Sequence, residues 1–171
     1  MTVPAVTAPF LASAALLAGA GGAKLWRPDD TARALRAAGL PAHRRLVRLG
    51  ALAELIVAVA SVVAPGPLTG ALVAAVYAAF TAFVGTALLR GWPISSCGCF
   101  GRPDTRPGLP HLTLDAAATV VATWWAAVAP HHIDRLLTPS PWHGWPLAFV
   151  AAVVAGLAYM VWTNPLERAA R

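Results

Sequence analysis

The sequence predicts an all-α protein that crosses the membrane several times, with four membrane helices in a bundle and one additional membrane helix at its side. Of the 171 residues, 58% are hydrophobic and only 12% are charged, and the mean hydropathy is +0.64. The apolar residues gather in five long segments, and the basic residues lie in the loops beside them. A soluble domain is far less apolar. The net charge of +6 is explained by membrane loops rather than by binding to nucleic acid.

Each apolar segment holds about 20 residues, the length that crosses roughly 30 Å of hydrocarbon as an α-helix. Strong breaks separate the segments, such as Pro65-Gly66-Pro67 after the second one. The first segment lacks the positively charged start of a signal peptide, so we expect a retained helix with an uncleaved N-terminus. We expect one membrane domain over residues 1–171, with spans at residues 3–23, 46–64, 68–89, 112–129 and 145–163.

The charges of the loops predict the orientation of the chain. Five spans place the loops at residues 24–48 and 90–111 on one side of the membrane, together with the C-terminal tail. These three segments carry every lysine and arginine except Arg135. By the positive-inside rule, we expect a multi-pass protein of the cell membrane with its N-terminus outside. The C-terminus and the 90–111 loop are then expected on the cytoplasmic side.

The loop at residues 24–48 carries the signals of a short helix of its own. Asp29 and Asp30 are candidate N-cap residues, and Gly39 is a candidate for the first residue beyond the helix. Pro41 prevents the helix from continuing. We expect this helix to be a solvated connector on the anionic inner leaflet that sets the topology, rather than a specific partner site.

The stretch Cys97-Gly98-Cys99-Phe100-Gly101 is the one place where the residue types point to covalent chemistry. Its two cysteines are the only ones in the chain, and glycines and prolines surround them. A Cys-x-Cys disulfide closes a very small ring far from relaxed geometry, and Gly98 lets the backbone bend enough to close it. Strained disulfides exchange readily. The pair is therefore expected to carry oxidising equivalents rather than to staple the fold.

Glu54 is a carboxylate within the second apolar segment. A charge at that depth is costly and marks a candidate functional site. Lys24, at the end of the first segment, lies near the same face of the membrane and could reach Glu54 by snorkelling. Two interpretations stay open. Glu54 either belongs to a structural ion pair or interhelical hydrogen bond, or accepts protons during thiol chemistry.

His111 and Asp115 stand at the start of the fourth segment, shortly after the cysteines. Four residues apart on a helix, they share one face. Asp115 either starts the helix by complementing its dipole, or orients His111 so that the imidazole takes a proton from a thiol. A metal site made of Cys97, Cys99 and His111 would have too few ligands for structural zinc, so we expect no metal.

Five features stand in order along the chain: Gly22-Ala23-Lys24-Leu25-Trp26-Arg27-Pro28, the break at Gly39-Leu40-Pro41, Glu54, the third apolar segment, and Cys97-Gly98-Cys99-Phe100-Gly101. Together they resemble the MauE family in the DoxX-like group of redox-associated membrane proteins, over nearly the whole chain. The resemblance implies a DoxX-like four-helix bundle plus one membrane helix. It implies a role, with a thioredoxin-like partner, in forming the disulfides of periplasmic methylamine dehydrogenase. It also implies that the two cysteines are the redox pair and that Lys24 and Glu54 are the family's polar positions.

The expected function is therefore that of an integral membrane thiol–disulfide redox protein that supports disulfide formation in a partner of the methylamine dehydrogenase type. The alternative is a non-catalytic membrane anchor or assembly subunit for a soluble oxidoreductase or sulfurtransferase. The expected catalytic residues are Cys97, Cys99, Glu54 and His111, supported by Lys24, Asp115, Gly98, Phe100 and Gly101.

The side of the membrane on which the cysteines act is a second open question. A periplasmic partner would meet them outside, whereas the loop charges place them inside. Either the cysteine loop folds back into the bundle and passes electrons to a quinone, or the partner is cytoplasmic, or one apolar segment does not span. We keep the cytoplasmic assignment because the charges belong to this sequence. Besides the lipid bilayer, the expected partner is a thioredoxin-like or other redox protein, and quinone is the one cofactor considered.

Overall fold

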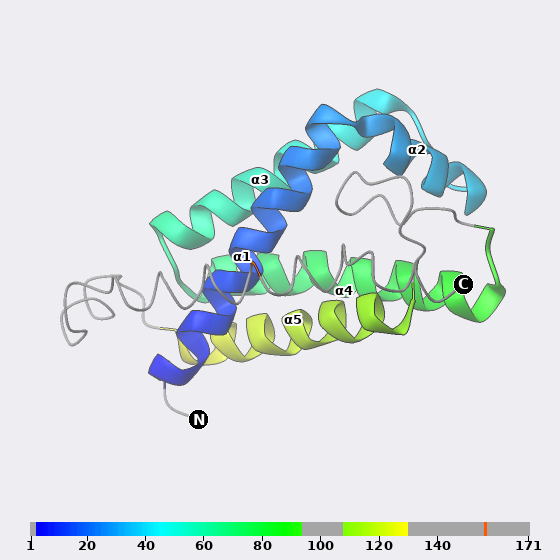
Figure 1. Ribbon diagram of the computed structural model, residues 1–171. Helices are drawn as coiled ribbons and strands as arrows, with labels where there is room; N and C mark the ends of the chain where they lie inside the picture. Colours follow the sequence, from blue (N-terminus) through cyan, green and yellow to red (C-terminus); the bar gives the residue numbers. More distant parts are fainter. Residues whose placement is uncertain (1–2, 94–107, 130–155, 157–171) are drawn as a thin grey trace.

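The computed structural model describes residues 3–93, 108–129 and 156, and the regular structure of these residues is entirely helical. The predicted all-α class is therefore confirmed. Four helices lie over the first four predicted spans, and the fifth, at residues 145–163, lies outside the described residues except for Gly156. The helices of Figure 1 are α1 (Val3–Trp26), α2 (Pro28–Ala37), α3 (Arg44–Val63), α4 (Pro67–Arg90) and α5 (Leu109–Val128).

Three of the described helices are long and apolar enough to cross a membrane. They are α1 over Val6–Trp26, α3 and α4. The helix α5 has a similar length, but His111, Asp115 and three threonines lower its hydropathy. The chain is thus a helical membrane protein with several candidate spans, and the crossing of the membrane by α5 stays a prediction.

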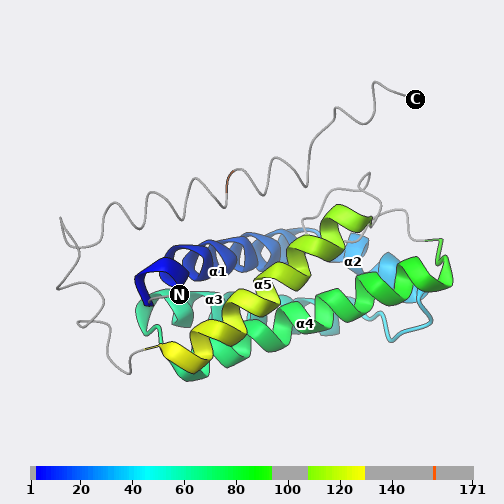
Figure 2. The same cartoon turned by 90° about the horizontal axis from the view of Figure 1, so that it is seen from below.

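The long helices form two antiparallel pairs, α1 with α3 and α4 with α5 (Figure 1). Figure 2 shows α5 running at an angle to α4, with the two helices closest where α4 begins and α5 ends. A glycine stands at the close approach in each pair. A Cβ atom at Gly21 would lie 2.9 Å from the carbonyl oxygen of Ala51, and one at Gly70 would lie 2.8 Å from Cδ1 of Trp125. Small residues at such crossings let the helix backbones come close together.

The central core joins the two pairs through aromatic side chains. Phe10 of α1 stacks on Trp125 of α5, with ring centroids 4.7 Å apart and planes 10° from parallel. The hydroxyl of Tyr77, on α4, donates a hydrogen bond to the carbonyl oxygen of Ser13 at a distance of 2.8 Å. Both Trp125 and Tyr77 are almost fully buried. A buried hydroxyl needs such a partner, and this one ties α4 to α1.

The short helix α2 packs at the end of the bundle where α1 ends and α3 begins (Figure 1). Gly39 has a φ of +72°. Leu40 donates to the carbonyl of Leu35 at 2.9 Å, and Gly39 donates to the carbonyl of Arg36 at 3.0 Å. This is a Schellman motif, in which glycine takes the left-handed position after the helix. The predicted role of Gly39 at the end of the short helix is therefore confirmed.

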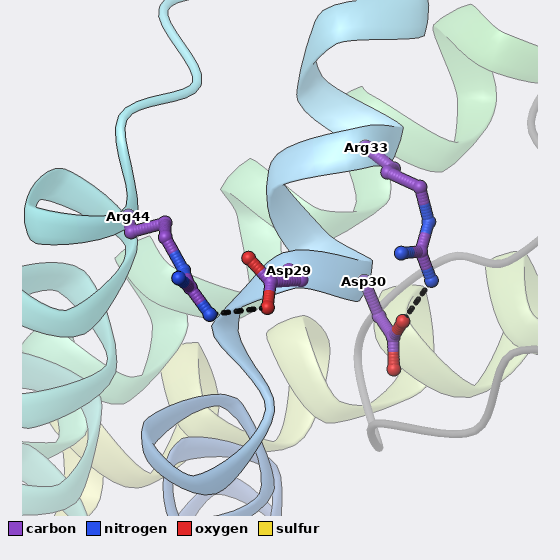
Figure 3. Close-up of polar contacts among 4 residues, drawn as sticks. All are labelled: Asp29, Asp30, Arg33 and Arg44. Carbon is purple, nitrogen blue, oxygen red and sulfur yellow. Dashed lines mark hydrogen bonds and ion pairs between the residues drawn. The ribbon is translucent and has the colours of Figure 1, made fainter.

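The start of α2 differs from the prediction. The N-cap residue is Arg27, and Pro28 occupies the first turn, where its missing N–H costs nothing. Asp29 and Asp30 thus lie inside the helix and point to opposite sides of it (Figure 3). Asp29 reaches Arg44 at the start of α3, at 2.5 Å, and Asp30 pairs with Arg33 one turn further on.

The short helix α2 was expected to be a solvated connector, but it also packs against the bundle. It buries Ala32 and Ala34, and Ala34 forms a small apolar cluster with Ala87, at the end of α4. Phe83 and Trp92 pack against this cluster. In Figures 1 and 2 the end of α4 and the start of α5 lie at the same end of the bundle as α2. This end of the bundle therefore carries the chain that enters and leaves the cysteine segment.

Candidate functional site

Lys24 and Glu54 form a buried ion pair between α1 and α3. The Nζ atom of Lys24 lies 2.7 Å from both Oε1 and Oε2 of Glu54. Their side chains are only 5% and 13% exposed. The contact between these residues that the sequence suggested is thus present. Breaking one half of such a pair would leave an uncompensated buried charge, so the two side chains depend on each other.

Phe80 of α4 adds a third contact to the ammonium group. The Nζ atom lies 4.3 Å from the centroid of the Phe80 ring. At this distance the electron-rich face of the ring attracts the cation. The lysine is therefore held between a carboxylate of α3 and an aromatic ring of α4. This contact could not be predicted from the sequence, because Phe80 is one apolar residue among many in its segment.

Gly21 brings the two halves of the ion pair together. It lies one helical turn before Lys24, and a Cβ atom there would lie 3.4 Å from Cβ of Glu54 and 3.2 Å from the backbone nitrogen of Leu55. The backbones of α1 and α3 are therefore close together beside the pair. This lets the long lysine side chain meet both carboxylate oxygens without leaving the protein interior.

A cavity of about 260 Å³ lies beside the ion pair. Four helices line it, α1 to α4, and its walls are mostly apolar. Lys24, Glu54 and Thr31 are its polar residues. The other lining residues are Ala34, Leu35, Leu46, Val47, Gly50, Ala51, Phe80, Phe83 and Val84. A concave, mostly apolar site with a few polar groups at one point is typical of a binding site for a small molecule.

His111 and Asp115 lie elsewhere, on α5. They are 8% and 2% exposed, and each has an interaction partner. The cavity beside Lys24 and Glu54 has no lining residue from α5. The candidate residues that the structure describes therefore fall into two groups, one between α1 and α3 and one on α5.

The proposed helix-starting role of Asp115 is wrong. The helix α5 begins at Leu109, so Asp115 lies nearly two turns inside it, and the first turn holds no acidic residue. The helix dipole acts mainly within the first turn. The stretch Leu109-Pro110-His111 reads as loop in the sequence because of its proline, yet proline is well tolerated in a first helical turn.

The cysteine stretch lies outside the described residues. This applies to Cys97, Gly98, Cys99, Phe100 and Gly101. The described chain stops at Pro93 and resumes at Gly108, next to α4 and α5. Among the residues that the structure describes, no three His, Cys, Asp or Glu side chains group as metal ligands.

Long apolar helices, small residues at the helix crossings and a buried ion pair define the chain as a polytopic α-helical membrane protein. The chain belongs to the MauE family, because the family model described as "Methylamine utilisation protein MauE" matches residues 1–128. The matched range contains all five described helices and both cysteines. No curated protein and no solved structure matches the chain.

Proposed function

We propose that this protein is a membrane thiol–disulfide redox protein that supports disulfide formation in a partner during methylamine utilisation. The main observation in support is the buried Lys24–Glu54 pair beside a cavity. The pair lies at the end of the bundle to which the cysteine segment is attached. A buried charge pair in a membrane bundle is costly, which favours a functional role. Membership of the MauE family supports the same pathway.

The proposed reaction is a thiol–disulfide exchange. One thiolate of the partner attacks the Cys97–Cys99 disulfide and forms a mixed disulfide with one of the two cysteines. The second partner thiolate then attacks the partner's own sulfur in this mixed disulfide and releases the cysteine as a thiolate. The partner loses two electrons and two protons and gains a disulfide, while Cys97 and Cys99 become thiols. Glu54 and His111 are proposed to handle the protons. Lys24 and Asp115 would hold these two groups in place, and Gly98 would allow the small ring to close.

The proposal also includes the orientation of the chain in the membrane. The arginines of α2 and of the start of α3 are exposed, and they lie at the end of the bundle to which the cysteine segment is attached. Their charge supports a cytoplasmic location for this end and an outside location for the N-terminus. The partner would then be a thioredoxin-like or other redox protein that reaches the cytoplasmic face.

Replacing both cysteines by serine is expected to abolish disulfide formation in the partner. The test uses a methylamine-utilising host that lacks its own copy, and it measures the disulfide content of methylamine dehydrogenase. Each single variant, Cys97→Ser or Cys99→Ser, should abolish disulfide formation as well, because the remaining cysteine cannot form the disulfide that the partner thiolate attacks. Ser96→Ala, in the same segment, is the matched control and should behave as the wild type.

The same experiment separates the redox function from a purely scaffolding one. If the double variant still supports full disulfide formation and still co-purifies with the partner, the protein is an anchor or assembly subunit. In that case the redox proposal is wrong.

A further inference from the structure

The cavity beside Lys24 and Glu54 has the size and the lining of a site for one small ring system. Its volume of about 260 Å³ lies just below the range of about 300–1,000 Å³ that is typical of ligand sites in proteins. Phe80 and Phe83 of α4 give it an aromatic wall, and Val47 and Leu35 close other sides. Aromatic walls pack well against flat rings.

The ion pair offers polar contacts to a neutral ligand rather than a free charge. Lys24 and Glu54 neutralise each other, so an anion or a cation would find no counter-charge there. Two of the three N–H donors of the ammonium group are used by the Glu54 oxygens, which leaves one donor, and each carboxylate oxygen can accept more than one hydrogen bond. A carbonyl oxygen can therefore accept a hydrogen bond from Lys24, and a hydroxyl group can donate one to Glu54.

Part of the cavity lining lies on an exposed stretch of α3 that is expected to contact lipid. Leu46 and Gly50 line the cavity and are exposed, and Leu49 between them is 62% exposed. Further along the same helix Leu52 and Ile56 are also exposed. In a membrane helix, exposed apolar residues of this kind face the hydrocarbon chains. A lipid-soluble ligand can thus enter from the bilayer.

We propose that the cavity binds the head-group ring of a lipid-soluble quinone, which accepts the electrons of the reduced cysteine pair. This rests on the proposed redox function. The Cys97 and Cys99 thiols lose two electrons and two protons as the S–S bond forms, and the quinone takes up both and becomes a hydroquinone. A quinone carbonyl suits the Lys24 donor and a hydroquinone hydroxyl suits the Glu54 acceptor, so the same ion pair accommodates both forms of the ring.

The test fills the cavity without touching the ion pair. A Cβ atom at Gly50 would meet nothing within 4 Å, so Gly50→Leu adds a side chain to the cavity lining without a backbone clash. Gly22→Leu is the matched control, because a Cβ atom there also meets nothing within 4 Å and Gly22 does not line the cavity. The full chain in lipid nanodiscs is titrated with decylubiquinone, and binding is measured by equilibrium dialysis.

We expect saturable binding of decylubiquinone that Gly50→Leu weakens by about tenfold or more, while Gly22→Leu keeps the wild-type affinity. The double variant Cys97→Ser/Cys99→Ser should also keep it, so binding is measured apart from thiol chemistry. Without oxygen, added decylubiquinone should oxidise the reduced wild-type cysteines and form an equal amount of hydroquinone. Gly50→Leu should slow this step.

Two results would overturn the inference: no saturable binding, or equal affinity in Gly50→Leu and Gly22→Leu. These failures differ from a failure of the proposed function. If the cysteines cycle with a partner but decylubiquinone does not bind, only the quinone site is wrong. If decylubiquinone binds in this cavity but the cysteines never form a disulfide, the site stands and the redox function is wrong.

Discussion

Replacing Lys24 with methionine is expected to lower the free energy of unfolding by about 3–5 kcal/mol, the range for a buried charge that loses its partner. Methionine keeps much of the length of lysine but carries no charge. The Glu54 carboxylate, 13% exposed, would lose both of its 2.7 Å contacts with Nζ. The measurement is denaturant unfolding of the purified protein in mixed micelles. The helices should loosen first between α1 and α3.

The double variant Lys24→Met/Glu54→Met should recover most of the lost stability, because replacing a whole buried ion pair by apolar residues is often neutral or stabilising. Arg44→Met is the control, since it breaks an ion pair whose side chains are 64% and 49% exposed. It should cost less than about 1 kcal/mol. An equal loss of stability in Lys24→Met and Arg44→Met would show that the buried Lys24–Glu54 pair contributes no more to stability than an exposed pair does.

Replacing Gly21 with leucine should destabilise the protein by about 1–3 kcal/mol or more, the usual cost of overpacking. Its Cβ atom would lie 2.9 Å from the carbonyl oxygen of Ala51, which is backbone and cannot swing away. The two helices would have to separate, and Lys24 would then lose its close contact with Glu54. The unfolding titration measures this loss of stability, and decylubiquinone binding reports on the cavity.

Gly22→Leu is the neighbouring control for this change. Gly22 has open space at its Cβ position, so leucine should fit there without a clash and should support the helix. A Gly21→Leu variant as stable as Gly22→Leu would contradict the close packing of α1 and α3.

The helices were predictable because their apolar segments are long and their ends carry proline and glycine. Pro65-Gly66-Pro67 marks the turn between α3 and α4, and Gly39 marks the end of α2. The predicted starts were late at α4 and α5, because Pro67 and Pro110 read as breaks. Proline lacks an N–H group that the first turn does not need, so a helix can begin at it.

The ion pair was predictable in outline, since a charge in an apolar segment demands a partner. The rest of the site was not. The contact of Phe80 with Lys24 and the lining of the cavity by α2 depend on how helices far apart in the chain pack together, and no local pattern marks them. Likewise, Asp115 seemed to start a helix only because Leu109-Pro110-His111 was assigned to the loop before it.

The most direct test of the account is the state of the two cysteines in native membranes. Membranes are treated with an alkylating maleimide before and after mild reduction, and again after reoxidation, and the labelled residues are identified by mass spectrometry. If Cys97 and Cys99 are a cycling redox pair, they resist alkylation when oxidised, react together after reduction, and regain their resistance after reoxidation. Alkylation of both thiols in every state of the folded protein would contradict this redox role.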